Sequence, residues 1–240
     1  MDRMTLLVPV YFPRDEPLTD ANVQGLTGFD IVLFGYWRTP EGADPDVIRE
    51  SHAVEAKAEL YDLAAQFSRA GASTSVQFHV GEPGADVHAR QEELAREVGA
   101  DAVVIPNEIT LWNNVFVPLR DDRNARRIVD FLTAFDQDTI FTLELYHVAT
   151  DQRDVEAARE MLAGVETMLY ERGFTESDLE VTVVVAPDPE AAIIERAGRH
   201  NVVVIGASEE HDGPARFLGE TYERIADQTA VPVVVVRDTP

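Results

Sequence analysis

The sequence predicts an α/β protein made of two doubly wound units, each a parallel sheet covered by helices on both faces. Short apolar runs rich in Val and Ile alternate with longer segments of helical period, which is typical of parallel sheets. The pattern occurs twice, and two pairs of segments resemble each other: 6–10 (LLVPV) with 115–119 (VFVPL), and 101–106 (DAVVIP) with 201–206 (NVVVIG). We therefore interpret the chain as an internal repeat.

The first half contains the elements of one smaller unit. Apolar runs of strand length occur at 5–10, 30–37, 74–80 and 102–106. Segments of helical period occur at about 52–70 and 86–98.

The second half contains a longer series of elements. Its predicted strands are 115–119, 139–147, 179–185, 202–205 and 231–236. Its predicted helices are 121–135, 151–172, 190–199 and 217–229. Apolar residues at spacings of three and four, as at Ile128, Phe131, Leu132 and Phe135, indicate helix faces directed at a core.

A short segment, 107–114, separates the two halves. Another helix and parallel strand need about a dozen residues or more, so the first half has no room for a fifth strand. We predict a first unit at 1–110, truncated to four strands, and a complete second unit at 113–240. In such sheets ligands bind at the carboxyl ends of the strands, where the strand order reverses.

The composition is strongly acidic. The chain carries 44 Asp and Glu against 20 Lys and Arg, a formal charge of -24, and Lys57 is its only lysine. This balance predicts a halophilic protein, because molar salt screens repulsion between surface carboxylates beyond about 3 Å. We expect partial unfolding at low salt. The same charge argues against a nucleic-acid partner, since binding to phosphates depends on basic residues.

The chain has no cysteine, which excludes disulfides, thiolate catalysis and cysteine-ligated metals. Residues 1–13 contain one apolar run of strand length followed by charged residues and proline, a pattern that fits neither a signal peptide nor a membrane span. We therefore expect a cytoplasmic location.

Several short motifs occur in a fixed order and spacing. They are Val-Pro at 8–9 and 117–118, YHVA at 146–149, GEP at 81–83, APDP at 186–189 and AVPVVVVR at 230–237. With these motifs the second half resembles the universal stress protein family over its whole length, and the first half resembles it over four strands. The resemblance implies the adenine nucleotide alpha hydrolase-like fold for each unit.

ATP-binding members of that family are similar in having a loop with Gly, two residues, Gly, nine residues, Gly and then Ser or Thr. Gly206 and Gly219 match the first and third glycines, but Glu209 replaces the second glycine and Glu220 replaces the hydroxyl residue. Glycine lets backbone N–H groups approach phosphate, and each glutamate adds negative charge there. The resemblance therefore implies a degenerate ATP loop.

The other positions of the candidate nucleotide cleft also depart from the family's pattern. Gly213 and Thr221 lie near the lost positions and would complete a rearranged phosphate site together with Gly206 and Gly219. Arg120 stands where the family has an aspartate near adenine, and its guanidinium would face an anionic ligand or pair with nearby carboxylates.

The first half lacks these features altogether. Tyr11 stands at the position of the family's aspartate, and Pro106 replaces the opening glycine of the loop. No fourth helix follows, so we expect no ATP binding in the family's manner by this unit.

No constellation in the sequence predicts catalysis or a metal site. His147 ends a predicted strand beside the cleft, where a single histidine is more often a packed side chain than a catalytic base. The histidines at 79, 88, 200 and 211 have no metal-ligand spacing with one another. No nucleophile elbow, complete phosphate loop or Ser-His-Asp order is present.

The last predicted strand, 231–236, is apolar and by resemblance forms the edge through which family members pair with a second copy. We expect either a homodimer through this edge or internal pairing of the two units. Three functions remain open: a non-enzymatic regulatory protein of the stress response, an interaction module for a membrane transporter or other partner, and an ATP-binding or slowly hydrolysing protein with a rearranged loop. No cofactor other than weakly bound ATP is implied.

Overall fold

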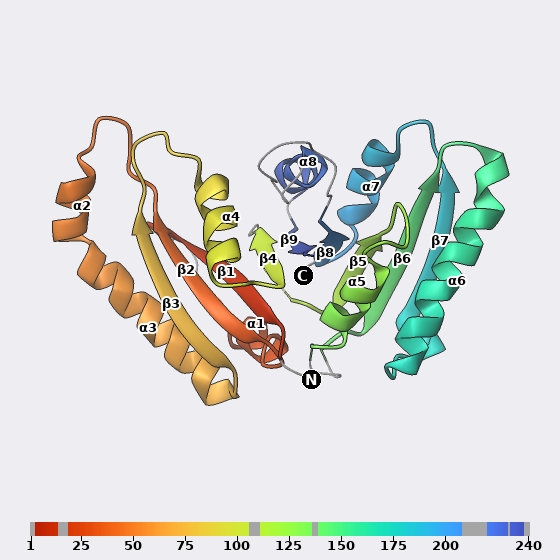
Figure 1. Ribbon diagram of the computed structural model, residues 1–240, viewed down its shortest axis with the longest axis horizontal. Coiled ribbons are helices and arrows are strands. Elements are labelled where there is room, and N and C mark those ends of the chain that lie inside the picture. Colours follow the sequence, from red (N-terminus) through yellow and green to blue (C-terminus); the bar gives the residue numbers. More distant parts are fainter. Residues whose placement is uncertain are drawn as a thin grey trace. The chain divides into compact units, whose positions relative to one another are not determined.

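The computed structural model describes residues 3–13, 19–105, 111–135, 139–207, 220–229 and 231–237, with the backbone alone at 21 and 220–223. Two compact units divide the chain, Met1–Val104 and Ile105–Pro240. Each unit contributes its own run of parallel strands and its own helices (Figure 1). The predicted end of the first unit, at 110, lies outside the described residues.

The first unit has four parallel strands in the order β3-β2-β1-β4. Its elements are β1 (Thr5–Phe12), α1 (Asp20–Gly25), β2 (Asp30–Trp37), α2 (Pro45–Ser51), α3 (Ala53–Ala70), β3 (Ser73–Val80), α4 (Val87–Glu97) and β4 (Ala102–Ile105). Strands β1 and β2 pair in register from Thr5 with Asp30 to Phe12 with Trp37. The buried face of α3 packs against β2 and β3 through residues such as Leu60 and Phe67.

Local sequence signals fix the ends of these helices. The Asp44 side chain accepts a hydrogen bond from the backbone N–H of Asp46, and Pro45 occupies the first helical position of α2. Asp86 caps α4 in the same way, at 2.9 Å from the His88 nitrogen. Helix α3 ends at Gly71, whose φ of 100° is the left-handed conformation that favours glycine.

The second unit has five parallel strands in the order β9-β8-β5-β6-β7. Its elements are β5 (Asn114–Pro118), α5 (Ala125–Leu132), β6 (Thr142–Ala149), α6 (Val155–Glu171), β7 (Leu179–Val185), α7 (Pro189–Ala197), β8 (Val202–Gly206), α8 (Glu220–Gln228) and β9 (Val233–Val236). Short 3-10 turns precede α6 and β7. The order of the first four strands repeats that of the first unit.

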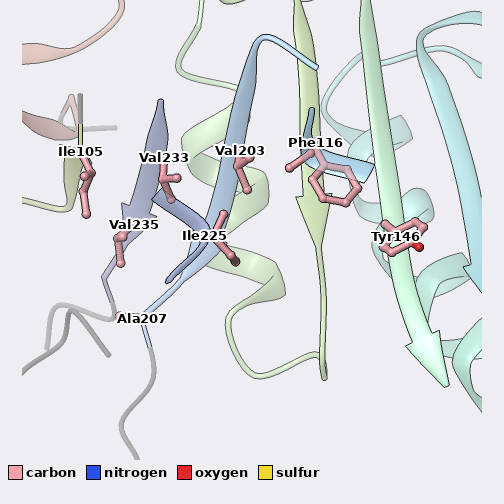
Figure 2. Close-up of a cluster of buried hydrophobic side chains, with 9 residues drawn as sticks. Ile105, Phe116, Tyr146, Val203, Ala207, Ile225, Val233 and Val235 are labelled. Carbon is pink, nitrogen blue, oxygen red and sulfur yellow. The ribbon is translucent and has the colours of Figure 1, made fainter. Parts of the chain in front are cut away.

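One buried cluster of the second unit lies between its strands and helices α7 and α8. Phe116 of β5, Val203 of β8 and Val233 of β9 are fully buried, and Ile225 of α8 packs over them (Figure 2). Tyr146 of β6 lies against Phe116, with ring centroids 5.2 Å apart. Complete burial of such side chains contributes about 1.5–3 kcal/mol each to stability.

The predicted α/β architecture is confirmed: the strands are parallel, with four in the first unit and five in the second. Two short helices, α1 and α2, were not predicted from the apolar periodicity. Helix α5 begins four residues later than predicted, because 121–124 form a turn in which Asp121 accepts a hydrogen bond from the Arg123 backbone. Among the described helices, none is long and apolar enough to cross a membrane.

Candidate functional site

The strand order of the second unit reverses between β5 and β8. From β5 the chain continues to β6 on one side, whereas β8 pairs with β5 on the other, through Val115 with Val202 and Phe116 with Val203. Ligands of doubly wound sheets bind at such a point, outside the carboxyl ends of the strands. The candidate site is therefore where Pro118 ends β5 and Gly206 ends β8.

Two arginines and one aspartate follow β5 at this edge. The Arg123 guanidinium donates two hydrogen bonds to Asp121 Oδ2, at 2.7 and 3.1 Å, and the Arg120 Nε lies 3.5 Å from the same oxygen. Hydrogen bonds from Arg123 hold the pKa of the Asp121 carboxyl below its usual value. Asp121 therefore already engages both of the cations that would face an anionic ligand here.

Asn124 is a site residue that the sequence did not reveal. Its Nδ2 donates a hydrogen bond of 2.9 Å to the Ala207 carbonyl, just past the end of β8. A Cβ added at Gly206 would lie 2.4 Å from the Asn124 Cβ, well inside normal contact. Glycine at 206 thus makes room for the Asn124 side chain, whether or not a phosphate is bound.

His147 lies near the carboxyl end of β6 and is held in place by β5. Its Nδ1 lies 2.8 Å from the Leu119 carbonyl, which only accepts, so this nitrogen carries the proton. The Leu119 N–H in turn donates to the Tyr146 carbonyl at 2.8 Å. His147 therefore has the packed role that is expected for a histidine at a strand end.

The remaining predicted loop residues are not described in the structure. Gly213, Gly219 and Glu209 lie outside the described residues. Thr221 and Glu220 lie in α8, where only the backbone is described. Of the candidate nucleotide residues, the structure therefore places Gly206 and Arg120, at the ends of the neighbouring strands β8 and β5.

The corresponding end of the first unit is occupied by its own side chains. The Arg38 guanidinium lies 4.2 Å from the centre of the Tyr11 ring, and the Tyr11 hydroxyl donates to Gln91 Oε1 at 3.3 Å. Burial raises the pKa of Tyr11 to about 12, so the phenol stays neutral. Tyr11, at the position of the family's aspartate, therefore packs within its own unit.

A buried charged cluster lies elsewhere in the second unit, near the amino end of β6. Glu144, fully buried, accepts hydrogen bonds of 2.8 Å from both Nε and Nη2 of Arg196 in α7. His200 Nε2 lies 3.0 Å from Glu144 Oε2, and the His200 ring stacks on Phe116 at 4.8 Å. This cluster binds α7 to the sheet, and its atoms are occupied by one another.

The described residues contain no group of three or more His, Cys, Asp or Glu side chains that could hold a metal ion. Carboxylates in this part of the chain instead pair with arginines, as Asp130 does with Arg172.

The family model described as "Universal stress protein family" matches residues 112–237, which is more than half of the 240 residues. The chain belongs to the universal stress protein family. No curated protein matches its sequence.

Two solved structures share the fold of this universal stress protein over nearly its whole length. A universal stress protein from Archaeoglobus fulgidus DSM 4304 has a TM-score of 0.61 at 16% identity and covers 99% of each chain. A putative universal stress protein from Pseudomonas aeruginosa UCBPP-PA14 has a TM-score of 0.55 at 14% identity, over 97% of this chain and 92% of that one. At these identities the similarity shows the fold alone.

Proposed function

We propose that this universal stress protein is a non-enzymatic regulatory protein of the stress response, acting in the cytoplasm of a salt-adapted organism. Its second unit keeps the family's cleft but binds nucleotide weakly or not at all. The observation that carries the proposal is that Asp121 engages both Arg120 and Arg123 at the carboxyl edge of the sheet.

The charge balance at this edge supports the proposal. A phosphate chain brings negative charge to a site where Glu209 and Glu220 already occupy positions that ATP-binding relatives leave uncharged. A unit charge at 4 Å costs about 4 kcal/mol at an effective dielectric of 20. The two arginines already share Asp121, so less of their positive charge is available to offset this repulsion, and we expect binding weaker than micromolar.

The direct test is calorimetric titration of ATP with Mg²⁺ into the protein in roughly 2 M KCl, where the Debye length is below about 3 Å. We expect no binding at micromolar concentrations. Micromolar binding that disappears in the Gly219→Glu variant would overturn the proposal in favour of a rearranged phosphate loop built from Gly206, Gly213, Gly219 and Thr221.

A gain of binding provides the sharper test. The double variant Glu209→Gly and Glu220→Ser restores the family's loop and removes two negative charges, so we expect it to bind ATP at least about tenfold more tightly than the native protein, a difference of about 1.4 kcal/mol. The control variant Glu41→Gly and Glu82→Ser makes the same two types of substitution and also removes two negative charges, but from exposed loops of the first unit. Equal gains in both variants would mean that net charge, not the loop, limits binding.

A further inference from the structure

Strand β7 is the outer strand of the second unit. Among the described strands it pairs with β6 alone, in register from Leu143 with Leu179 to Ala149 with Val185 (Figure 1). A strand in this position offers its second row of backbone N–H and C=O groups to another strand. The side chains that flank this row decide what can pair with it.

The side chains of β7 lack the usual protection of an edge strand. Val181 is 39% exposed and Val185 is 47% exposed, and the strand contains no lysine or proline. Its one charged residue, Glu180, contacts Arg196 of α7 at 3.1 Å. Native proteins normally discourage pairing at exposed edges with lysine, proline or a bulge.

The outer strand of the first unit provides the contrast. In β3, which pairs with β2, the exposed side chains are those of Ser73, Ser75 and Gln77. The two units repeat the same strand order, but the first has a polar outer strand and the second an apolar one. The exposed valines of β7 are therefore specific to the second unit.

We propose that β7 pairs antiparallel with β7 of a second copy of this chain, about a twofold axis at Val183. In this register Val181 lies opposite Val185 of the second copy, so the two exposed valines cover each other. Glu180 lies opposite Ala186, so the strands bring no like charges face to face. Directly opposed apolar pairs stabilise a sheet, whereas opposed like charges destabilise it.

Salt and size determine how strong this pairing is. Each copy carries a formal charge of -24, so association requires screening of the long-range repulsion by molar salt. Pairing of one short strand buries less than the roughly 1,200 Å² of a standard interface. The dimer is therefore weak and concentration-dependent, and covalent trapping is the suitable way to detect it.

The absence of native cysteine makes trapping specific. In the Val183→Cys variant the two introduced thiols lie opposite each other, with Cα atoms about 4.5–5.5 Å apart, which a disulfide can span. Mild oxidation in roughly 2 M KCl should give a covalent dimer. The matched control Ser75→Cys places a thiol on the polar edge β3 and should remain monomeric.

The register has its own test. Val181→Cys and Val185→Cys should each crosslink poorly alone and efficiently when mixed, because residue 181 of one copy faces residue 185 of the other. The proposal is overturned if Val183→Cys, folded by circular dichroism, gives no more dimer than Ser75→Cys. It is equally overturned if sedimentation detects a native dimer that Val183→Cys does not trap, since the copies would then meet at another surface.

A charged substitution gives an independent measurement. Val181→Lys places a lysine on the edge of β7, and we expect the dissociation constant of the dimer to rise at least about tenfold in sedimentation equilibrium at high salt. Ser75→Lys adds the same charge to β3 and should leave the constant unchanged. An unchanged constant in Val181→Lys would contradict the pairing.

Discussion

Arg196 in α7 and Glu144 in β6 form a two-point ion pair inside the second unit, with both N–H···O distances at 2.8 Å. The carboxylate is fully buried, and the side chain of Arg196 is 25% exposed. Burial of Glu144 raises the pKa of its carboxyl, but hydrogen bonds from His200, Arg196 and Thr182 outweigh burial and lower the pKa to about 2. The charged carboxylate is therefore the form that holds α7 against the sheet.

Replacing this carboxylate should destabilise the second unit. Glu144→Gln leaves Arg196 and His200 without the anion that they share, and we expect a loss of about 3–5 kcal/mol in the free energy of unfolding. The measurement is urea unfolding at neutral pH and molar salt. Glu180→Gln is the matched control, because this exposed carboxylate contacts the same Arg196 at 3.1 Å and should cost less than about 1 kcal/mol. Similar losses in both variants would contradict the special role of Glu144.

The effect of Glu144 should depend on pH in a defined direction. Its folded pKa, about 2, lies below the ordinary value of 4.5, so the stabilisation is fully present above pH 4.5 and is lost as the pH falls toward 2. A difference of this size corresponds to about 3 kcal/mol. The stability difference between the native protein and Glu144→Gln should therefore shrink as the pH is lowered from about 6 to 3. A difference that stays constant over this range would show that Glu144 acts through packing and not through its charge.

The apolar pattern was enough to predict the strands, because each central strand of a parallel sheet is a nearly continuous buried run. The predicted bounds of β2 and β7 coincide with those observed. Helix α2 was missed because none of its residues is buried, so it has no apolar stripe; its signal was the cap, Asp44 followed by Pro45. Capping residues would have revealed it where periodicity could not.

The site was harder to predict because its contacts join distant parts of the chain. Gly206 was found from its place in a spaced motif, but Asn124 was not, since its contact with Ala207 spans 83 residues. The Glu144 cluster did leave a signal, a glutamate within an apolar strand followed by Arg196 and His200 at helical spacing. The sequence pattern does not show which residue faces inward. The structure does, because Arg196 pairs with Glu144.

Gly206 offers a test of the close approach between β8 and α5. In Gly206→Ala the new Cβ would lie 2.4 Å from the Asn124 Cβ, so the asparagine must move and its hydrogen bond to Ala207 is lost. We expect a destabilisation of about 1–3 kcal/mol in urea unfolding. In the control Gly164→Ala, where nothing lies within 4 Å of the new Cβ, helix α6 should gain about 1 kcal/mol. A neutral Gly206→Ala variant would mean that Asn124 has another position at little cost.

Salt should stabilise the whole chain by screening its surface carboxylates. The formal charge of -24 predicts a thermal midpoint in about 0.1 M KCl at least about 10 °C below that in about 2 M KCl, equivalent to roughly 3 kcal/mol for a chain of this size. Differential scanning calorimetry over a series of KCl concentrations measures it. Because a chain of two compact units need not unfold in a single step, each transition in the scan is followed by itself.

The outer face of α3 provides the variant that tests the cause. Glu55, Glu59 and Asp62 are exposed on this helix, so Glu55→Gln, Glu59→Gln and Asp62→Asn together remove three charges with little change in packing. If repulsion between carboxylates is the reason for the salt dependence, this triple variant should raise the midpoint of the first unit at low salt and flatten its dependence on KCl. The opposite result has two parts: the native midpoint is equal at both salt concentrations, and the triple variant has the same dependence on KCl as the native protein. That result would show that the acidic surface does not limit stability.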